Sequence, residues 1–394
     1  MLLANEPIPR EGSHRAGAAL GHPRRSPSAA LLAGGATLLV GAVVAFGFMT
    51  GAWRLDGPSP TTGASPVGSG GEPHSSTPVT VGLDQVGRFQ PLDLDPTDLE
   101  PPGAIVGFDI EGSWLAYANG NDGVTRVAIG DPANPRPMAT YGMSGAVAVA
   151  LDGETIAAAG LPDGSLGLSF FRVDGSGGAI VPIVADGVST AYGLEVGGGS
   201  AYVTSHNYVG IVDAQVPAAP RMVFEWTPPA STGNPCTVFV TDGVGYFGAG
   251  WDGLYLFDLA DLEAPRLLGH WASPAWVIDV VVAGQIAYLT LGEGGLATLD
   301  VSDPASPRLL GSVTIPGFAG PIDVANGHAI VGWMGETGAM GGVAIVDVAD
   351  PAAPALMETF RRFPALSHLQ LAGDHLFVSD ESEGLLVFRI TGID

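Results

Sequence analysis

The sequence contains no lysine and only one cysteine, Cys236, in 394 residues. A single cysteine excludes an intramolecular disulfide, so packing and hydrogen bonds alone must hold the fold together. A catalytic thiol needs a neighbouring base, and no motif around Cys236 supplies one. We therefore interpret Cys236 as a bystander.

Positive charge is also scarce. The 15 basic residues are all arginine and stand against 40 Asp and Glu, which gives a net charge of −25. From residue 81 onward there are only 10 arginines and 36 acidic residues. Such a body repels phosphate backbones and anionic lipid head groups, so we expect no nucleic-acid partner. We interpret the acidity as an aid to solubility, and a functional acidic surface is the alternative.

Signatures of known enzyme chemistry are missing as well. No Gly-x-Ser-x-Gly, His-Glu-x-x-His, phosphate-binding loop or dinucleotide fingerprint occurs in its required context. No loop has the dense acidic spacing of a calcium site, so the repeated acidic turns are interpreted as turn caps. We expect no cofactor and no metal, and whether the protein is an enzyme stays open at this stage.

The N-terminal region has the pattern of a membrane anchor. Residues 29–53 carry no charge, and about 20 apolar residues suffice for a helix to cross a bilayer. Arginines precede this stretch and only Arg54 follows closely, so we expect residues 1–28 to be a cytoplasmic tail. A cleaved signal peptide is the alternative, which would make the protein secreted. Residues 54–80, rich in Gly, Ser, Pro and Thr, predict a flexible stalk that leads to an exported domain over 81–394.

Residues 81–394 contain an internal repeat. The clearest copies begin at Gly253, Gly295 and Gly342, and each runs through an apolar stretch into an acidic, proline-containing turn. Four fainter copies lie at 123–135, 164–174, 208–220 and 384–390. The period of about 41–47 residues fits one four-stranded propeller blade. We predict an all-β fold, a seven-bladed β-propeller, preceded by the single transmembrane helix.

One unit shows how a blade reads in sequence. Apolar runs at 277–282, 286–289 and 295–301 predict three strands, with the first innermost. Asp303 and Pro304 then predict a turn, because Asp accepts backbone hydrogen bonds and Pro fixes φ at the next position. The fourth strand begins at Arg308.

These units resemble the LVIVD repeat of bacterial and archaeal cell-surface proteins. The resemblance covers nearly four-fifths of the chain; it is strongest in units four to six and weakest in unit two, where Asp174-Gly175-Ser176 replaces the Asp-Pro turn. Similar proteins are taken to form β-propellers, and no common activity is known for them. The resemblance therefore implies a fold more than a function.

The ends of the repeat predict how the ring closes. The seventh unit supplies three strands and the chain ends where its fourth should begin, whereas residues 84–90 resemble an isolated fourth strand. We predict that residues 84–90 complete the last blade, which leaves no open sheet edge at the closure.

Loops on one face of the predicted propeller carry most of the tryptophans. We expect this face to bind a partner through tryptophans that stack on a sugar or anchor a protein, and His206 lies in one of these loops. The alternative is that these rings fill the core between blades. The candidate binding residues are Trp226, Trp251, Trp271, Trp276, Trp333 and His206.

The mouth of the central channel is the second candidate site. Aligning the units places Phe108, Ala148, Gly193, Thr237, Asp279, Asp323 and His368 at matching positions of the innermost strands. A histidine with two carboxylates has the chemistry to move protons or bind a metal. Asp at this place in similar repeats looks structural, which is the competing interpretation.

Two functions follow as hypotheses. The first is a non-catalytic binding or scaffold module, displayed outside the cell by the anchor, whose partner is an extracellular protein or a glycan. The second is a propeller enzyme, a hydrolase, lyase or oxidoreductase, that uses Asp279, Asp323 and His368 at the channel mouth. A structural subunit of an envelope complex is a further possibility.

Overall fold

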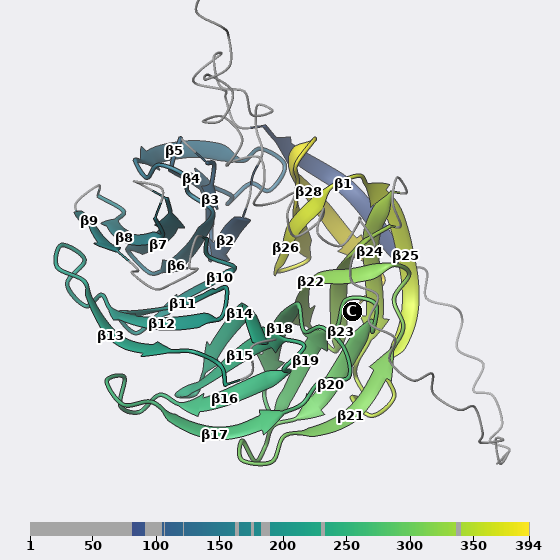
Figure 1. The fold of residues 1–394 in the computed structure, drawn as a ribbon. Coiled ribbons are helices and arrows are strands. Elements are labelled where there is room, and N and C mark those ends of the chain that lie inside the picture. The colour runs from purple at the N-terminus through teal and green to yellow at the C-terminus, as the bar shows by residue number, and fades with distance from the viewer. Residues whose placement is uncertain are drawn as a thin grey trace, which may run out of the picture. The chain divides into compact units, whose positions relative to one another are not determined.

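The domain is built from seven four-stranded antiparallel sheets arranged around a common centre (Figure 1). The computed structural model describes residues 81–90, 105, 107–120, 122–161, 165–174, 177–182, 190–229, 233–335 and 340–393. Within these residues, every regular secondary-structure element is a β-strand. The innermost strands of consecutive blades contact one another, and β26 (Leu366–Ala372) of the last blade contacts β2 (Gly107–Glu111) of the first. The described part is therefore a seven-bladed β-propeller, as the repeat period predicts.

The first four blades follow one another along the chain, and in each the strands run from the centre outward. Blade 1 consists of β2 (Gly107–Glu111), β3 (Trp114–Ala118), β4 (Val124–Ala128) and β5 (Arg136–Tyr141). Blade 2 consists of β6 (Ala148–Asp152), β7 (Thr155–Gly160), β8 (Gly167–Arg172) and β9 (Gly177–Pro182). Blade 3 consists of β10 (Gly193–Gly197), β11 (Ser200–Ser205), β12 (Tyr208–Asp213) and β13 (Arg221–Trp226). Blade 4 consists of β14 (Gly233–Thr241), β15 (Val244–Gly250), β16 (Leu254–Asp258) and β17 (Arg266–Trp271).

The last three blades include the one that closes the ring. Blade 5 consists of β18 (Asp279–Ala283), β19 (Ile286–Thr290), β20 (Leu296–Asp300) and β21 (Arg308–Val313). Blade 6 consists of β22 (Phe318–Ala325), β23 (His328–Met334), β24 (Gly341–Asp347) and β25 (Ala355–Phe363). Blade 7 consists of β26 (Leu366–Ala372), β27 (His375–Asp380), β28 (Gly384–Thr391) and β1 (Gly82–Phe89).

The hydrophobic core lies in the seams between blades. The two middle strands of a blade are buried on both faces, as in β11, where all six residues are buried. One core cluster joins Leu254 and Leu256 of blade 4 to Val280, Leu289 and Leu299 of blade 5. Sheets that pack on both faces need continuous apolar runs, which accounts for the apolar stretch in every repeat.

The outermost strand of every blade contains a β-bulge at the same place. One residue in each of these strands is skipped in the pairing with its neighbour, and the seven are Val86, Met138, Gly178, Val223, Leu268, Leu310 and Met357. A bulge twists the strand and interrupts its regular outer edge. The bulges therefore protect the propeller against edge-to-edge pairing with other sheets.

Acidic turns connect the third and fourth strands and lock onto the preceding blade. In blade 5 the Asp303 carboxylate accepts a hydrogen bond from the Ala305 amide at 3.1 Å, and Asp300 pairs with Arg308 at 2.6 Å. A side chain on Gly269 of blade 4 would overlap the carbonyl oxygen of Pro304 in this turn. The turn thus seats on the outer strand of the blade before it, where only glycine leaves room.

The strand β1 closes the ring by pairing antiparallel with β28 over Gly82–Phe89. The prediction that residues 84–90 complete the last blade is confirmed, and the strand begins two residues earlier than expected. β1 also carries the bulge of a fourth strand, and a side chain on its Gly87 would overlap Pro132 of the blade 1 turn. The N-terminal strand therefore reproduces both features of an outer strand.

The predicted anchor and stalk, residues 1–80, lie outside the described residues. Among the residues that the structure does describe, none forms a helix that is both long and apolar enough to span a bilayer. The transmembrane helix over 29–53 stays a prediction.

We expect Gly87→Val to destabilise the propeller by about 2–4 kcal/mol, because the new side chain must push the Pro132 turn away from β1. Thermal unfolding of the purified chain measures this loss. Gly197→Val is the matched control, because nothing lies within 4 Å of a Cβ atom placed there. Equal melting temperatures for the two variants would contradict the proposed seating of the turn.

Candidate functional site

The hydrogen-bond registers of the innermost strands correct the sequence-based alignment of the residues expected at the mouth of the central channel. Asp279 pairs with Thr290 and His368 with Ser379, both four residues before the hairpin turn. Asp323 pairs with Ile330 only two residues before its turn, and Phe108 pairs with Tyr117 three residues before its own. The predicted match was therefore wrong for Asp323 and Phe108. Asp279 and Asp323 both lie in an Ile-Asp-Val tripeptide, but the hairpin after Asp323 turns two residues sooner.

The register places Asp323 level with a different set of side chains. The residues at this level of the other blades include Asp109, Glu195 and Gln370. Sequence reasoning missed all three. The apolar-Asp-apolar pattern of Phe108-Asp109-Ile110 was the available signal, since it matches that around Asp279 and Asp323.

Carboxylates on the innermost strands bind the free backbone edge of the next blade. The Asp279 carboxylate accepts hydrogen bonds from the amides of its own neighbour Val280, at 2.9 Å, and of Ile322 in blade 6, at 3.1 Å. The Asp323 carboxylate does the same with Val324 and with Leu371 in blade 7, both at 2.7 Å.

The same arrangement recurs at the first blade and across the closure. The Asp109 carboxylate accepts from Ile110 and from Leu151 in blade 2, both at 2.8 Å. The Gln370 side-chain oxygen of blade 7 accepts from the Ile110 amide of blade 1 at 2.9 Å. An innermost strand is hydrogen-bonded on one side only, so these side chains satisfy amides that would otherwise face the channel unpaired. The carboxylates therefore join neighbouring blades.

Burial changes the protonation of these groups. It raises the pKa of Asp279 to about 6 against the lowering effect of its hydrogen bonds, and it also raises the pKa of Asp109 and Asp323. Burial, with repulsion from Asp109 and Asp279, raises the pKa of Glu195 to about 8. Four carboxyl groups from four blades thus repel their neighbours at the centre of the ring.

His368, also on an innermost strand, is a neutral imidazole. Burial lowers the pKa of His368 to about 4, and its ring lies edge-on to Phe108 with centroids 4.8 Å apart. Among the residues described, no three His, Cys, Asp or Glu side chains come close enough together to hold a metal ion. The arrangement supports structural hydrogen bonding by Asp279 and Asp323 and aromatic packing by His368.

Three of the five candidate tryptophans pack between blades. Trp226 and Trp271 each lie three residues after the bulge of an outer strand, a position that Phe89 and Tyr141 occupy in other blades. Trp226 packs edge-on against Tyr255 of blade 4 at 4.9 Å, and Trp271 packs against the core between blades 4 and 5. Trp333 is only 1% exposed, within the core between blades 5 and 6.

The other two tryptophans form a pair on the loop face. Trp251 is 54% exposed and meets Trp276 edge-on, with ring centroids 5.7 Å apart. Trp251 lies in the loop between β15 and β16, and Trp276 lies in the connection between β17 and β18. A backbone bridge between Gly250 and Val277 joins these two segments. His206, also exposed, belongs to the corresponding loop of blade 3. The structure therefore brings Trp251 and Trp276 together and separates them in role from the other three.

The next residue, Asp252, fixes this loop to the blade. Its carboxylate accepts a hydrogen bond from the Tyr255 hydroxyl, and its carbonyl lies 2.6 Å from Nε2 of His270. The His270 ring stacks on Tyr255 with centroids 4.2 Å apart. Trp251 is thus presented by a loop anchored on both sides, which reduces the entropy lost when it binds a partner.

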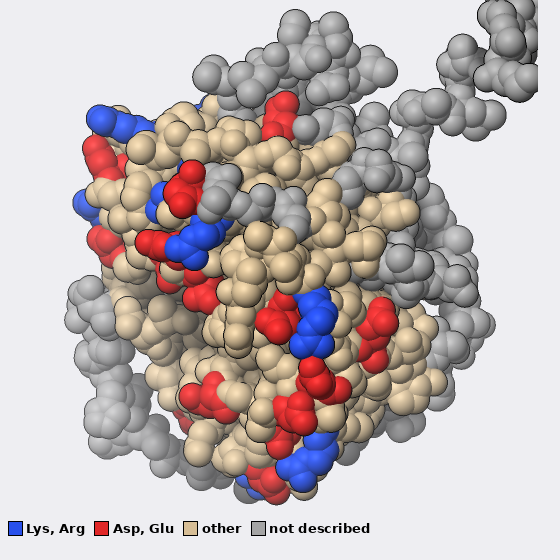
Figure 2. All heavy atoms as spheres, turned by 90° about the vertical axis from the view of Figure 1, so that its left-hand side faces the viewer, with Lys and Arg blue, Asp and Glu red and all other residues tan. Residues whose placement is uncertain are grey.

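Charged side chains elsewhere are mixed rather than segregated. On the side shown in Figure 2, Arg side chains stand among Asp and Glu. Among the ion pairs of the described residues, Arg221 pairs with Glu263 of the next blade at 3.0 Å. Exposed pairs of this kind contribute little to stability, and they leave no large basic surface on this side for an anionic ligand.

Known structures share this architecture. The computationally designed Ika8 protein is 10% identical, with a TM-score of 0.52, over 78% of this chain and all of that one. The WD40 β-propeller domain of Doa1 is 12% identical, with a TM-score of 0.57, over 78% of this chain and 97% of that one. Identities this low indicate the fold alone.

Comparison with protein families adds the repeat itself. The family described as the LVIVD repeat matches residues 190–227, 276–315 and 339–361. The chain carries LVIVD repeats. Two of the matched stretches cover blades 3 and 5 and the third covers β24 and most of β25, so the LVIVD signal reaches unit three but not unit four, which the sequence had placed among the strongest. No curated protein matches the chain significantly.

We expect Glu195→Gln to make the stability of these LVIVD blades less dependent on pH. In the wild type the pKa of Glu195 is raised to about 8, so between its ordinary value and pH 8 the folded state binds more protons and stability falls as pH rises. The variant should therefore be more stable than wild type by up to about 5 kcal/mol at pH 9, and the difference should fall below about 1 kcal/mol at pH 5.

Thermal unfolding of both proteins at pH 5, 7 and 9 measures this difference. Glu293→Gln, at an exposed loop position, is the control and should change stability by less than about 0.5 kcal/mol at each pH. A constant offset between Glu195→Gln and wild type across the three pH values would show that the pKa of Glu195 is not raised in the folded protein.

Proposed function

We propose that the protein is a non-catalytic binding or scaffold module that acts outside the cytoplasm. The propeller fold with its LVIVD repeats supports a binding or scaffold role, because such wheels offer loop surfaces on a rigid ring. The observation that carries the proposal is the pair of Trp251 and Trp276. An exposed indole on an anchored loop is a typical hot spot for recognition.

The partner in this proposal is an extracellular protein or a glycan. Indole rings bind the apolar face of a sugar by stacking, and they fill pockets of protein partners equally well. The acidic body disfavours anionic partners. His206, exposed on the same face one blade earlier, is an additional polar contact for a ligand that reaches across the two loops.

The channel residues support catalysis less well. Proton transfer by Asp279 or Asp323 requires a free carboxylate oxygen, and in each of them both oxygens accept backbone amides. His368 is neutral and packed on Phe108, so its ring is placed for packing rather than for substrate.

Display at the membrane is the second part of the proposal. The uncharged stretch 29–53 would anchor the chain with its N-terminus in the cytoplasm, and residues 54–80 would hold the propeller away from the lipid. β1 starts at Gly82, so the chain enters the propeller at its rim, on the outermost strand of blade 7.

Binding through the tryptophan pair is tested with Trp251→Ala in the full chain. We expect affinity for a ligand found on a glycan array, or for a partner isolated with the wild-type protein, to fall at least about tenfold, while the melting temperature changes by less than about 2 °C. Leu309→Ala removes an equally exposed apolar side chain from blade 5 and should leave binding unchanged. Equal loss in both variants would argue against the pair.

Membrane display has its own test. After carbonate extraction of cells that express the full chain, we expect the protein in the membrane fraction, and external protease should digest the propeller in intact spheroplasts. Recovery of a shortened chain from the medium would instead indicate a cleaved signal peptide.

A further inference from the structure

Three seams of the propeller contain a turn of the same kind at the same place. The carbonyl oxygens of Pro132, Pro304 and Pro351 lie where a side chain on Gly87, Gly269 or Gly311 of the preceding blade would be. In one of these seams the hydroxyl of Thr298, which pairs across the sheet with Gly311, donates a hydrogen bond to the Pro351 carbonyl. Each of these Asp-Pro turns therefore occupies a shallow seat on the outer part of the blade before it.

The seam between blades 1 and 2 has a shorter hairpin at this place, as the pairing of the described residues shows. In blade 1 nine residues lie between the paired residues Val127 and Pro137, whereas in blade 2 five lie between the paired residues Phe171 and Gly177. The blade 2 hairpin is thus four residues shorter. The seat in front of it has alanine, Ala139, at the position that Gly87, Gly269 and Gly311 occupy elsewhere.

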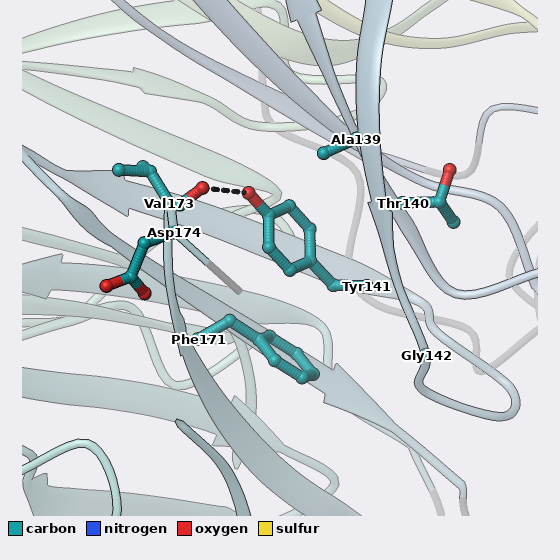
Figure 3. Close-up of a pocket in the computed structure, with 7 residues that line it drawn as sticks. All are labelled: Ala139, Thr140, Tyr141, Gly142, Phe171, Val173 and Asp174. Carbon is teal, nitrogen blue, oxygen red and sulfur yellow. Dashed lines mark hydrogen bonds between the residues drawn. The ribbon is translucent and has the colours of Figure 1, made fainter. Parts of the chain in front are cut away.

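A hollow of about 290 Å³ lies at this seat (Figure 3). Its walls are residues 139–142 of blade 1 and Phe171, Val173 and Asp174 of blade 2. The Tyr141 hydroxyl donates a hydrogen bond of 3.0 Å to the Val173 carbonyl, and the Tyr141 ring packs on Phe171 at 5.4 Å. The hollow is therefore held open by a fixed aromatic wall rather than filled by it, and its volume suits a small turn.

Arg126 is the cross-strand neighbour of this seat. It pairs across the sheet with Ala139, as Thr298 does with Gly311, so it holds the register position from which Thr298 binds the seated turn of the next blade. Its guanidinium lies 3.6 Å from the ring of Trp114, and within the described residues it makes no ion pair. Arg126 also acts to lower the pKa of Tyr141, which burial raises, so the charge reaches the aromatic wall.

We propose that this hollow, the blade 1–2 notch, binds an acidic proline turn of another polypeptide, of the Asp-Pro-x-x-Pro type. The turn would take the place that Asp303-Pro304 and its equivalents take elsewhere, and its proline carbonyl would accept a hydrogen bond from Arg126. The equivalent seats that Pro132, Pro304 and Pro351 fill in other seams favour this occupant. Asp174 in the wall of the hollow would repel an aspartate of the turn, and the positive charge of Arg126 offsets that repulsion. A second copy of this chain is disfavoured because its turns at Pro132, Pro304 and Pro351 are already seated on their own blades.

The notch is separate from the Trp251 loop, which belongs to blade 4, so this proposal does not depend on the proposed function. A fluorescent cyclic peptide that contains Asp-Pro-Ala-Ser-Pro, the sequence of residues 303–307, is titrated into the full chain and its polarisation is measured. We expect saturable binding that falls at least fivefold in Arg126→Gln and is lost in Ala139→Leu, which fills the seat. Arg136 is exposed on β5, the strand that carries Ala139, and Arg136→Gln should bind the peptide as the wild type does. No binding at millimolar peptide, or unchanged binding in Ala139→Leu, would overturn the proposal.

A second variant tests the seat without a free peptide. Replacing residues 172–176 by the nine-residue sequence of 300–308 restores a full turn in blade 2. We expect this graft to raise the melting temperature and to reduce peptide binding at least tenfold. A lower melting temperature together with unchanged peptide binding would argue against the seat.

Two other occupants are distinguished by the same titration. If Asp95→Ala with Pro96→Ala tightens peptide binding, the notch belongs to residues 91–104 of this chain and the proposal fails. It fails equally if the wild type is a dimer that the peptide dissociates, because a second copy is then the occupant.

Discussion

A wheel of sheets depends on the pairing that closes it. Here β1 and β28 come from opposite ends of the domain, and their antiparallel pairing makes blade 7 equivalent to the other six. Without it, the edge of β28 would be exposed and the core between blades 7 and 1 would lose Val86 and Phe89. A closing strand that also has the bulge and the glycine seat of an outer strand ties the first described residues to the last.

The seams between blades carry most of the other interactions that hold the ring together. At the centre, Asp109, Asp279 and Asp323 bind the free amides of the next blade. At the periphery, large apolar residues such as Trp226 wedge between sheets and Asp-Pro turns seat on the preceding outer strand. A chain with one cysteine thus replaces covalent staples by many small contacts repeated around the ring.

Repetition also makes departures from the pattern informative. A residue that recurs at the same position in every blade stabilises the propeller. A position at which one blade differs from the others leaves surface that another molecule can contact. Trp251 leaves the pattern by its exposure on the loop face, beside the half-buried Trp276, and blade 2 leaves it by its shortened hairpin. Both departures point to recognition of other molecules and fit a module whose central carboxylates are already engaged in backbone hydrogen bonds.

Part of this could be predicted from sequence because it depends on local chemistry. The period, the strands, the closing strand and the Asp300–Asp303 turn follow from patterns a few residues long, since turn and strand formation are governed by neighbours in the chain. The role of a side chain across a seam was not available in the same way. Asp279 and Asp323 share a tripeptide yet stand two residues apart in register. The Trp226 ring packs on Tyr255 of the next blade, whereas Trp251 in its loop stays 54% exposed. The sequence by itself determined the repeating blade and its closure, whereas the packing of one blade on the next decided which polar and aromatic side chains are structural, because those contacts join residues about 40 positions apart.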